Sequence, residues 1–348
     1  MFLDHFGLRE QPFGVTPDPH FLYFSPSHLE ALASLFYGIQ SRRGFMALIA
    51  KPGMGKTTLL FHLLERLRKS ARTAFLFQRY SDARDFLRSL MSDLGVNGKD
   101  EDLGRMYGKF NEVLVREARA GRRVVVVIDE AQNLEDSVFE TVRMLSNFEL
   151  PGMKLMQILL AGQPQLADKL ASRNLVQLRQ RISVLSRLTQ FNSDDTAKYV
   201  GHRLQVAGHR GNPLFAADAL EIIHSRSEGI PRNINNLCFH ALTLGFATGQ
   251  KTIGASILSE VLEDLDIRML GSGLCGHAGP GELTTQEELA CPKWSGQTSI
   301  SDNADLHSTI SAEHSAHDAC QEQKSSTSDC GPWSASKWIG GVTHEQKC

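Results

Sequence analysis

Ala50-Lys51-Pro52-Gly53-Met54-Gly55-Lys56-Thr57-Thr58 follows directly after the apolar stretch Phe45 to Ile49. A strand, a glycine-rich turn, a lysine and a threonine in this order are typical of a phosphate-binding loop. Backbone N–H groups of such a loop bind phosphate oxygens, the lysine reaches the β and γ phosphates, and the threonine hydroxyl binds Mg²⁺. The stretch therefore predicts a site for a nucleoside triphosphate such as ATP, with Mg²⁺. Its expected binding residues are Pro52, Gly53, Met54, Gly55, Lys56, Thr57 and Thr58.

The loop departs from the usual G-x-x-x-x-G-K-[ST] pattern at its first position, which is Ala50. Glycine there mainly eases the turn from strand to loop, and a small alanine serves if its φ is negative. The alternative interpretation is that Gly-Lys-Thr forms only a surface turn. A second segment, which ends in two acids, argues against that alternative.

That second segment is Arg123 to Glu130, a run of β-branched residues that ends in two carboxylates. A continuous apolar run of this kind indicates a central parallel strand buried on both faces. Its carboxyl end is the edge at which α/β sheets bind ligands. We expect Asp129 to hold Mg²⁺ and Glu130 to polarise the water that attacks the γ-phosphate. The alternative is that both acids merely cap the next helix.

Composition places the chain among ordinary globular proteins. Its 348 residues suggest about two or three domains, and 41% hydrophobic with 22% charged residues is unexceptional. The net charge of -2 combines a mildly basic part before Gly271 with an acidic part after it. Such a charge is compatible with nucleic acid but does not require it. Without an 18-residue apolar window or a signal-peptide pattern, we expect a soluble cytoplasmic protein with no membrane span.

The order of patterns predicts an α/β fold, a parallel five-stranded sheet flanked by helices. Apolar strand patterns over residues 45–49, 73–78, 123–128 and 155–163 alternate with helical ones, and a fifth strand is expected after residue 187. From residue 194 four helical patterns follow one another, which predicts an all-helical lid. The segment from about Gly271 is rich in Ser, Gly, Gln and Thr and reads as disordered. The predicted domains are a nucleotide-binding domain over 1–192, a lid over 193–268 and a tail over 269–348.

Several ordered motifs together resemble one family, the AAA+ P-loop ATPases of the ExeA/GspA general-secretion type. The motifs are the phosphate loop, Asp129 to Leu134, Leu145 to Asn147, Ala161 to Leu166, Gly229 to Asn235 and the opening Phe6-Gly7-Leu8 with Pro12-Phe13 and Thr16 to Pro19. The resemblance covers roughly residues 1 to 268. It implies an ATPase that couples the nucleotide state to movement between the sheet domain and the lid.

The resemblance also implies roles for residues outside the phosphate loop and the segment Arg123 to Glu130. Gln163 matches sensor 1, where an amide holds the γ-phosphate or the attacking water, although a strand-end turn residue is the alternative. Arg232 matches sensor 2, which reaches from the lid to the phosphates, although it could instead pair with a surface acid. The region of Arg179, Arg181 and Arg187 is where the family carries its arginine finger. We expect Arg181 to be that finger and Arg179 to be the next candidate. The alternative is that these arginines only form a solvated basic face of a helix.

The family implies partners as well. A finger acting across subunits implies a homo-oligomer, and relatives assist the assembly of secretion machinery at the cell envelope. Many of them carry a membrane helix and a cell-wall-binding domain, patterns that this sequence lacks, so an envelope role would run through a protein partner. The alternatives are a DNA-associated ATPase regulator of the transposition type and a nucleotide-binding scaffold that hydrolyses little. Pro17, Tyr23 and His28 are expected near the base, with packing or capping as the alternative for His28.

Overall fold

The computed structural model describes residues 2–80, 82–96 and 102–272. Its central feature is a parallel sheet of five strands in the order β2-β3-β6-β1-β7, which confirms the predicted architecture. The strands are β1 (Phe45–Ala50), β2 (Ala71–Leu76), β3 (Arg123–Ile128), β6 (Met156–Gly162) and β7 (Ile182–Leu188). The fifth strand was expected after residue 187, which was wrong, because β7 begins at Ile182 and contains Arg187. A short antiparallel hairpin, β4 (Glu149–Leu150) with β5 (Met153–Lys154), was not predicted.

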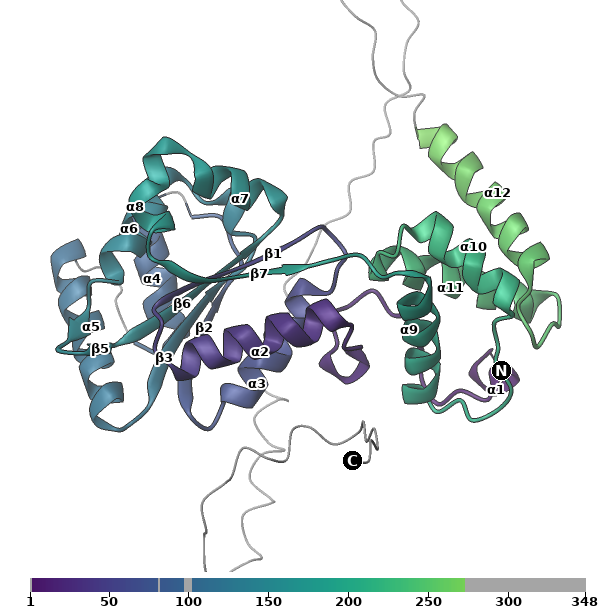
Figure 1. Cartoon of the computed structure of the whole chain (residues 1–348), viewed down its shortest axis with the longest axis horizontal. Coiled ribbons are helices and arrows are strands. Elements are labelled where there is room, and N and C mark those ends of the chain that lie inside the picture. The colour runs from purple at the N-terminus through teal and green to yellow at the C-terminus, as the bar shows by residue number, and fades with distance from the viewer. Residues whose placement is uncertain (1, 81, 97–101, 273–348) are drawn as a thin grey trace, which may run out of the picture. The chain divides into compact units, whose positions relative to one another are not determined.

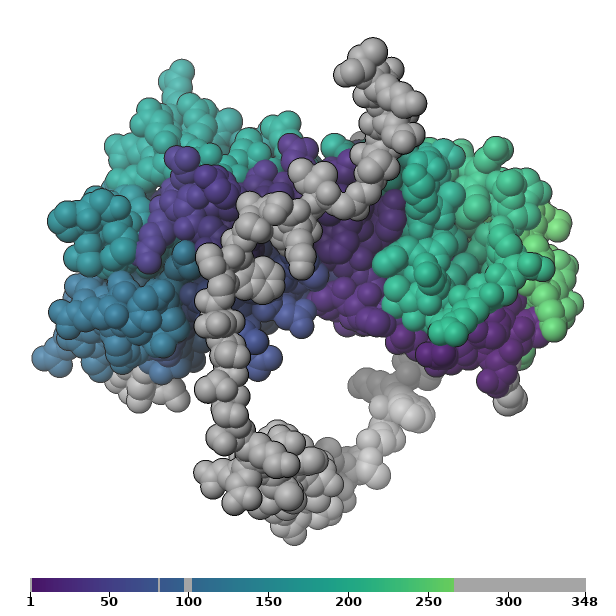
Figure 2. Space-filling model, turned by 60° about the horizontal axis from the view of Figure 1, so that its bottom comes forward, coloured from purple at the N-terminus to yellow at the C-terminus, as the bar shows by residue number. Residues whose placement is uncertain are grey.

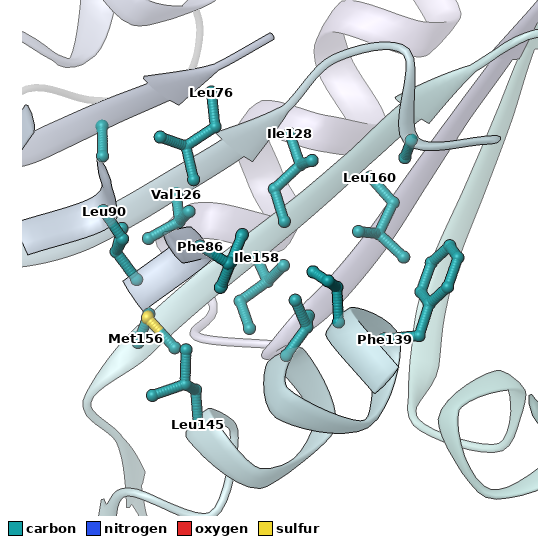
Figure 3. Packing of buried hydrophobic residues seen from close by; sticks show 14 of the residues in the cluster. Leu76, Phe86, Leu90, Val126, Ile128, Phe139, Leu145, Met156, Ile158 and Leu160 are labelled. Atoms are coloured by element: carbon teal, nitrogen blue, oxygen red, sulfur yellow. The ribbon is translucent and has the colours of Figure 1, made fainter. Parts of the chain in front are cut away.

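Helices cover both faces of this sheet (Figure 1). One face packs on α2 (Pro26–Gln40) and α3 (Lys56–Leu67). The other packs on a larger set: α4 (Ala83–Asp93), α5 (Leu103–Arg119), α6 (Asp136–Leu145), α7 (Pro164–Ala171) and α8 (Val176–Arg179). Figure 3 shows the apolar layer on this second face, where Phe86 and Leu90 of α4 lie close to Val126 and Ile158 of the sheet. Strands buried on both faces explain the unbroken apolar run at β3.

Strand order brings together the three segments that the sequence singled out. β1 pairs in parallel with β6, and β6 pairs in parallel with β3, so the carboxyl ends of these three neighbours lie along one edge. The phosphate loop follows β1, Asp129 and Glu130 follow β3, and Gln163 follows β6. Side chains that are more than a hundred residues apart in the chain, such as Lys56 and Gln163, are therefore neighbours at this edge.

The second part of the fold is helical, as predicted. It consists of α9 (Ser193–Val206), α10 (Ala217–Ser227), α11 (Pro231–Ala247) and α12 (Ala255–Ser272). Their apolar faces form a separate core around Leu204, Ile223, Leu242 and Leu258. The predicted tail lies outside the described residues from 273 onward.

The N-terminal segment packs into this helical core and not against the sheet. It includes α1 (Phe2–Phe6) and the 3₁₀ turn η1 (Pro19–Phe21), and it buries Phe6, Leu8, Phe13 and Phe21 among the lid side chains. Figure 2 shows the purple N-terminal residues against the green helices. The predicted boundary at residue 192 groups these residues with the sheet domain, whereas their side chains belong to the core of the lid.

The N-cap of α2 is Ser25 and not the neighbouring Ser27. The Ser25 hydroxyl accepts from the backbone N–H of His28, with Pro26 in the first turn. Proline at that position has no N–H to satisfy and a φ already suited to the helix. Ser27 instead accepts a hydrogen bond from the backbone N–H of Thr189 at 3.3 Å.

Gly229, in the turn between α10 and α11, has the sharpest steric requirement in the lid. Its φ is +65°, and a Cβ placed there would lie 2.0 Å from the carbonyl oxygen of Phe191. Phe191 N–H donates to the Gly229 carbonyl at 2.9 Å, so the two segments cannot separate without losing this bond. We predict that Gly229→Ala lowers the free energy of unfolding by about 3 kcal/mol or more.

Urea denaturation followed by circular dichroism measures this loss. Gly201→Ala is the matched control, because Gly201 lies inside α9 with open space around its Cα. Alanine is the better helix former by about 1 kcal/mol, so the control should be neutral or slightly stabilising. Equal stability of both variants would contradict the steric argument.

Candidate functional site

A cavity of about 230 Å³ lies at the sheet edge described above, and the lid contributes to its wall. The phosphate loop, Glu130 and Gln163 line it from the sheet side. The wall also includes Gly14–Asp18, Phe21–Tyr23, His28, Phe191, Tyr199, Arg203, Pro231, Arg232 and Asn235. All the loop residues predicted to bind phosphate, together with Pro17, Tyr23 and His28, therefore meet at one cavity.

The N-terminus of α3 is prepared for an anion. The helix begins at Lys56, and its N-cap position is Gly55, which offers no side chain to accept from the first-turn N–H groups. The first N–H groups of a helix have no partner within the helix, and the positive end of the helix dipole lies there. A phosphate group is the ligand that satisfies both features.

Lys56, Thr57 and the two acids form one hydrogen-bonded cluster. The Lys56 ammonium donates to the buried carboxylate of Asp129 and to Glu130 Oε1, the latter at 2.8 Å. The Thr57 hydroxyl donates to Asp129 Oδ2 at 2.8 Å. This pair of oxygens fits Mg²⁺, which prefers hydroxyl and carboxylate oxygen with phosphate completing its shell. Thr57 and Asp129 are thus the residues that would hold the metal.

Glu130 has an unusual backbone and a well-anchored side chain. Its φ is +51°, in the left-handed region that few residues other than glycine adopt. Its Oε2 accepts from Gln132 Nε2 at 2.6 Å and from Gln163 Nε2 at 3.0 Å. Partial burial raises the pKa of this carboxyl, but the hydrogen bonds from Lys56, Gln132 and Gln163 outweigh burial, so the net shift is downward. Glu130 is therefore an ionised acceptor directed by three donors.

His28 supports the phosphate loop from behind. Its Nε2 lies 3.0 Å from the Met54 carbonyl oxygen, and its Nδ1 lies 2.8 Å from Ser25 Oγ. A carbonyl only accepts, so Nε2 carries the proton. Burial lowers the pKa of His28 despite its bond to Met54, which keeps the ring neutral and leaves Nδ1 to accept from the Ser25 hydroxyl. His28 thus links the start of α2 to the loop. These contacts are a packing role, and the same residue also lines the cavity.

Arg232 joins the lid to the loop through its backbone. Its N–H donates to the Gly53 carbonyl at 3.1 Å, and the side chain is exposed at the cavity wall. Pro231 precedes it at the first position of α11. Among the described residues no hydrogen bond or ion pair of the Arg232 guanidinium is found, which leaves its donors for a ligand.

The three candidate finger arginines lie away from this cavity. Arg181 Nη1 donates to the Ser146 hydroxyl, to Asn147 Oδ1 at 2.7 Å and to the Arg143 carbonyl at 3.3 Å, at the carboxyl end of α6. Arg179 and Arg187 are exposed. None of the three lines the cavity of its own chain, so any role in hydrolysis would be on another subunit.

Sequence reasoning missed two groups of residues at this site. Gln132 contacts both Glu130 and Gln163, and its only signal was its place two residues after Glu130. The second group is Tyr199, Arg203 and Asn235, which line the cavity from α9 and α11. Arg203 is buried, donates to the Tyr199 hydroxyl at 2.9 Å and lies 4.7 Å from the centre of the Phe21 ring. The helical periodicity of α9 predicts burial of such residues but not their exposure to a cavity.

A phosphate loop after β1, acids after β3 and a polar residue after β6 are the fold and site of a P-loop NTPase. Residues 39–170 match the family described as AAA domain. The chain is 39% identical over 254 residues to general secretion pathway protein A of Aeromonas hydrophila, a match covering 73% of this chain and 46% of that protein. Both matches support the interpretation of this chain as an AAA+ P-loop ATPase similar to the ExeA/GspA general-secretion type. The chain spans about half the length of that relative.

Solved structures share the fold at low sequence identity. The Aeropyrum pernix ORC2 protein, solved as ADPNP–ADP complexes, is 15% identical with a TM-score of 0.57, over 73% of this chain and 71% of that one. The Cdc6p protein of Pyrobaculum aerophilum is 17% identical with a TM-score of 0.53, over 68% of each chain. None of the described helices combines the length and apolar character that crossing a membrane requires.

Proposed function

We propose that this protein binds ATP with Mg²⁺, hydrolyses it, and uses the cycle to drive a conformational or assembly step in a secretion or envelope-assembly system. The observation that carries the proposal is the cluster of Lys56, Thr57, Asp129 and Glu130 at the uncapped N-terminus of α3. These residues supply a cation, metal ligands and a carboxylate base at one anion site. The 39% identity to general secretion pathway protein A supports the choice of process.

Each residue has a separate role in the proposed reaction. Lys56 binds the β and γ phosphates, and Thr57 with Asp129 holds Mg²⁺, which neutralises charge on the phosphates. The oxygen of a water molecule bonds to the γ-phosphorus as the bond to the ADP oxygen breaks, and Glu130 takes the water proton. Gln163 orients the water or the γ-phosphate.

Arg232 would couple this chemistry to the lid. Its backbone is bonded to Gly53 and its exposed guanidinium is at the cavity wall, so γ-phosphate binding would pull α11 toward the loop. Loss of the γ-phosphate after hydrolysis would release α11 from the loop. The lid core contains the N-terminal segment, so that segment would move with the lid.

The test of the proposal is phosphate release from ATP with Mg²⁺, repeated with EDTA. Hydrolysis that stops when the metal is removed supports the function, and a lack of metal-dependent hydrolysis by the folded oligomer contradicts it. A pull-down with Glu130→Gln and ATP then identifies the partner held in the ATP state. Recovery of secretion components supports the proposed process, with the protein acting from the cytoplasm. Recovery of a DNA-bound recombinase favours the transposition-type alternative.

We also infer that the protein forms a homo-oligomer in which Arg181 completes a neighbouring site. The Arg181 side chain is preorganised at the end of α6, which suits a guanidinium that stabilises transition-state charge on another subunit. We predict that specific ATPase activity rises with protein concentration and that Arg181→Ala lowers the activity of the oligomer about a thousandfold. Steady-state assays over a dilution series measure both effects.

Arg119→Ala is the control for this experiment, because Arg119 is an exposed arginine at the end of α5, outside the region of the candidate fingers. Arg181 could instead serve only to cap α6, in which case the variant would melt at a lower temperature without losing activity. Specific activity that is independent of concentration and unchanged in Arg181→Ala would rule out the finger.

A further inference from the structure

Gln132 lies directly behind the proposed catalytic carboxylate. It is half-buried and belongs to the short 3₁₀ turn η2 (Ala131–Asn133) that follows Glu130, and it does not line the cavity. Its amide makes two hydrogen bonds in different directions. Nε2 lies 2.6 Å from Glu130 Oε2, and Oε1 lies 3.1 Å from the backbone nitrogen of Gln163.

The orientation of this amide follows from its partners. The Gln163 backbone N–H can only donate, so Gln132 must present its oxygen there. The nitrogen of Gln132 is then the atom that faces the carboxylate, which can only accept when ionised. Both ends of one side chain are therefore satisfied, and the bridge has a single favourable orientation.

Gly162 provides independent support for the bridge. A Cβ on Gly162 would lie 2.6 Å from Gln132 Oε1 and 2.8 Å from Leu166 Cδ2, both closer than real Cβ contacts allow. The end of β6 therefore has no side chain at the place where the Gln132 amide passes. The same β6 end leads into Gln163, so the bridge ties the ends of β3 and β6 together.

We propose that Gln132 is a positioning residue for hydrolysis, which orients Glu130 by anchoring its Oε2 to the end of β6. This inference rests on the proposed function. Glu130 Oε1 is bonded to Lys56, and Lys56 is the residue expected to turn to the phosphates. Oε2 keeps its bonds to Gln132 and Gln163, so the carboxylate stays oriented while Oε1 becomes free to accept the water proton.

The test separates orientation of the base from binding of nucleotide. Gln132→Met keeps the side-chain length but removes both hydrogen bonds. We expect kcat to fall at least tenfold while the Kd for a fluorescent ATP analogue changes less than twofold, since Lys56 and Thr57 are untouched. Gln165→Met is the matched control, because Gln165 is an exposed glutamine on α7 and should keep wild-type kcat.

Gln132→Ala removes the same two hydrogen bonds with a smaller side chain and should reproduce the kcat loss, which keeps the test available if Gln132→Met does not fold. Wild-type kcat in a folded Gln132→Met variant overturns the inference. A rise in kcat also overturns it, because the bridge would then restrain Glu130. Equal losses of kcat and nucleotide affinity overturn it as well, since they indicate general distortion. If the wild-type protein shows no ATPase activity, the proposed function fails instead.

Discussion

Lys56→Ala should abolish nucleotide binding, with the Kd for ATP rising at least about a hundredfold, or about 2.8 kcal/mol. Two effects add in this variant. The charge-assisted hydrogen bonds from the ammonium to the phosphates are lost. Asp129, which is buried beside Lys56, is left with an unneutralised negative charge facing an anionic ligand. Titration with a fluorescent ATP analogue measures the change.

The same substitution should also reduce stability, because removing one partner of a buried ion pair is costly. Circular dichroism must therefore show that the variant is folded before its binding is interpreted. Lys69→Ala is the control, since Lys69 is an exposed lysine just beyond the same helix. Binding by folded Lys56→Ala at the wild-type Kd would contradict the assigned role.

Glu130→Gln should bind ATP normally and hydrolyse it about a hundred to ten thousand times more slowly than the wild type. The amide cannot take a proton from water, whereas the phosphate loop and the metal ligands remain in place. The new amide nitrogen would have to face either the donor groups of Gln132 and Gln163 or the Lys56 ammonium. Two donors would meet in either orientation, so at least one of the present hydrogen bonds becomes unfavourable. Single-turnover phosphate release with a parallel binding titration measures both quantities.

The pKa of Glu130 supplies a second check on this assignment. Burial raises the pKa of Glu130, but its hydrogen bonds outweigh burial and hold the pKa below its usual value in the folded protein. The stabilisation from this lowered pKa is present above the unfolded-state pKa and is lost as pH falls through the folded-state value. Protonation of Glu130 in the free enzyme should therefore not reduce kcat/KM between about pH 6 and 8. Wild-type turnover in Glu130→Gln would exclude Glu130 as the base.

The core of the site could be predicted from local sequence. The phosphate loop is one continuous stretch, and the two acids end a continuous apolar run, so each part carries its own pattern. Their meeting follows from one general rule about parallel sheets. Strand order β3-β6-β1 then makes Asp129, Gln163 and Lys56 neighbours. The roles of Gln163, Arg181 and Arg232 came from family resemblance and stay predictions.

The remaining parts of the site have no such local pattern. Gln132 sits two residues from Glu130 in sequence, but its second partner is 31 residues away. Arg203 on α9 reaches the Pro12 carbonyl 191 residues away, and Asn235 reaches the Gly14 carbonyl across 221 residues. Helical periodicity states only that these positions face a core. Which core they face depends on how distant segments pack.

The sequence by itself determined the parallel sheet, the helical lid, the phosphate loop and the acids. Each of these has a local pattern, because the periodicity of apolar residues, a run of β-branched residues and the spacing of glycines all involve residues that are close in sequence. Only the tertiary structure placed the N-terminal segment in the lid core, the Gln132 bridge behind Glu130 and Arg181 at the end of α6. It also required glycine at 229, where a carbonyl from a distant segment occupies the space of a Cβ. These features depend on close approach between remote backbones, which no local pattern records.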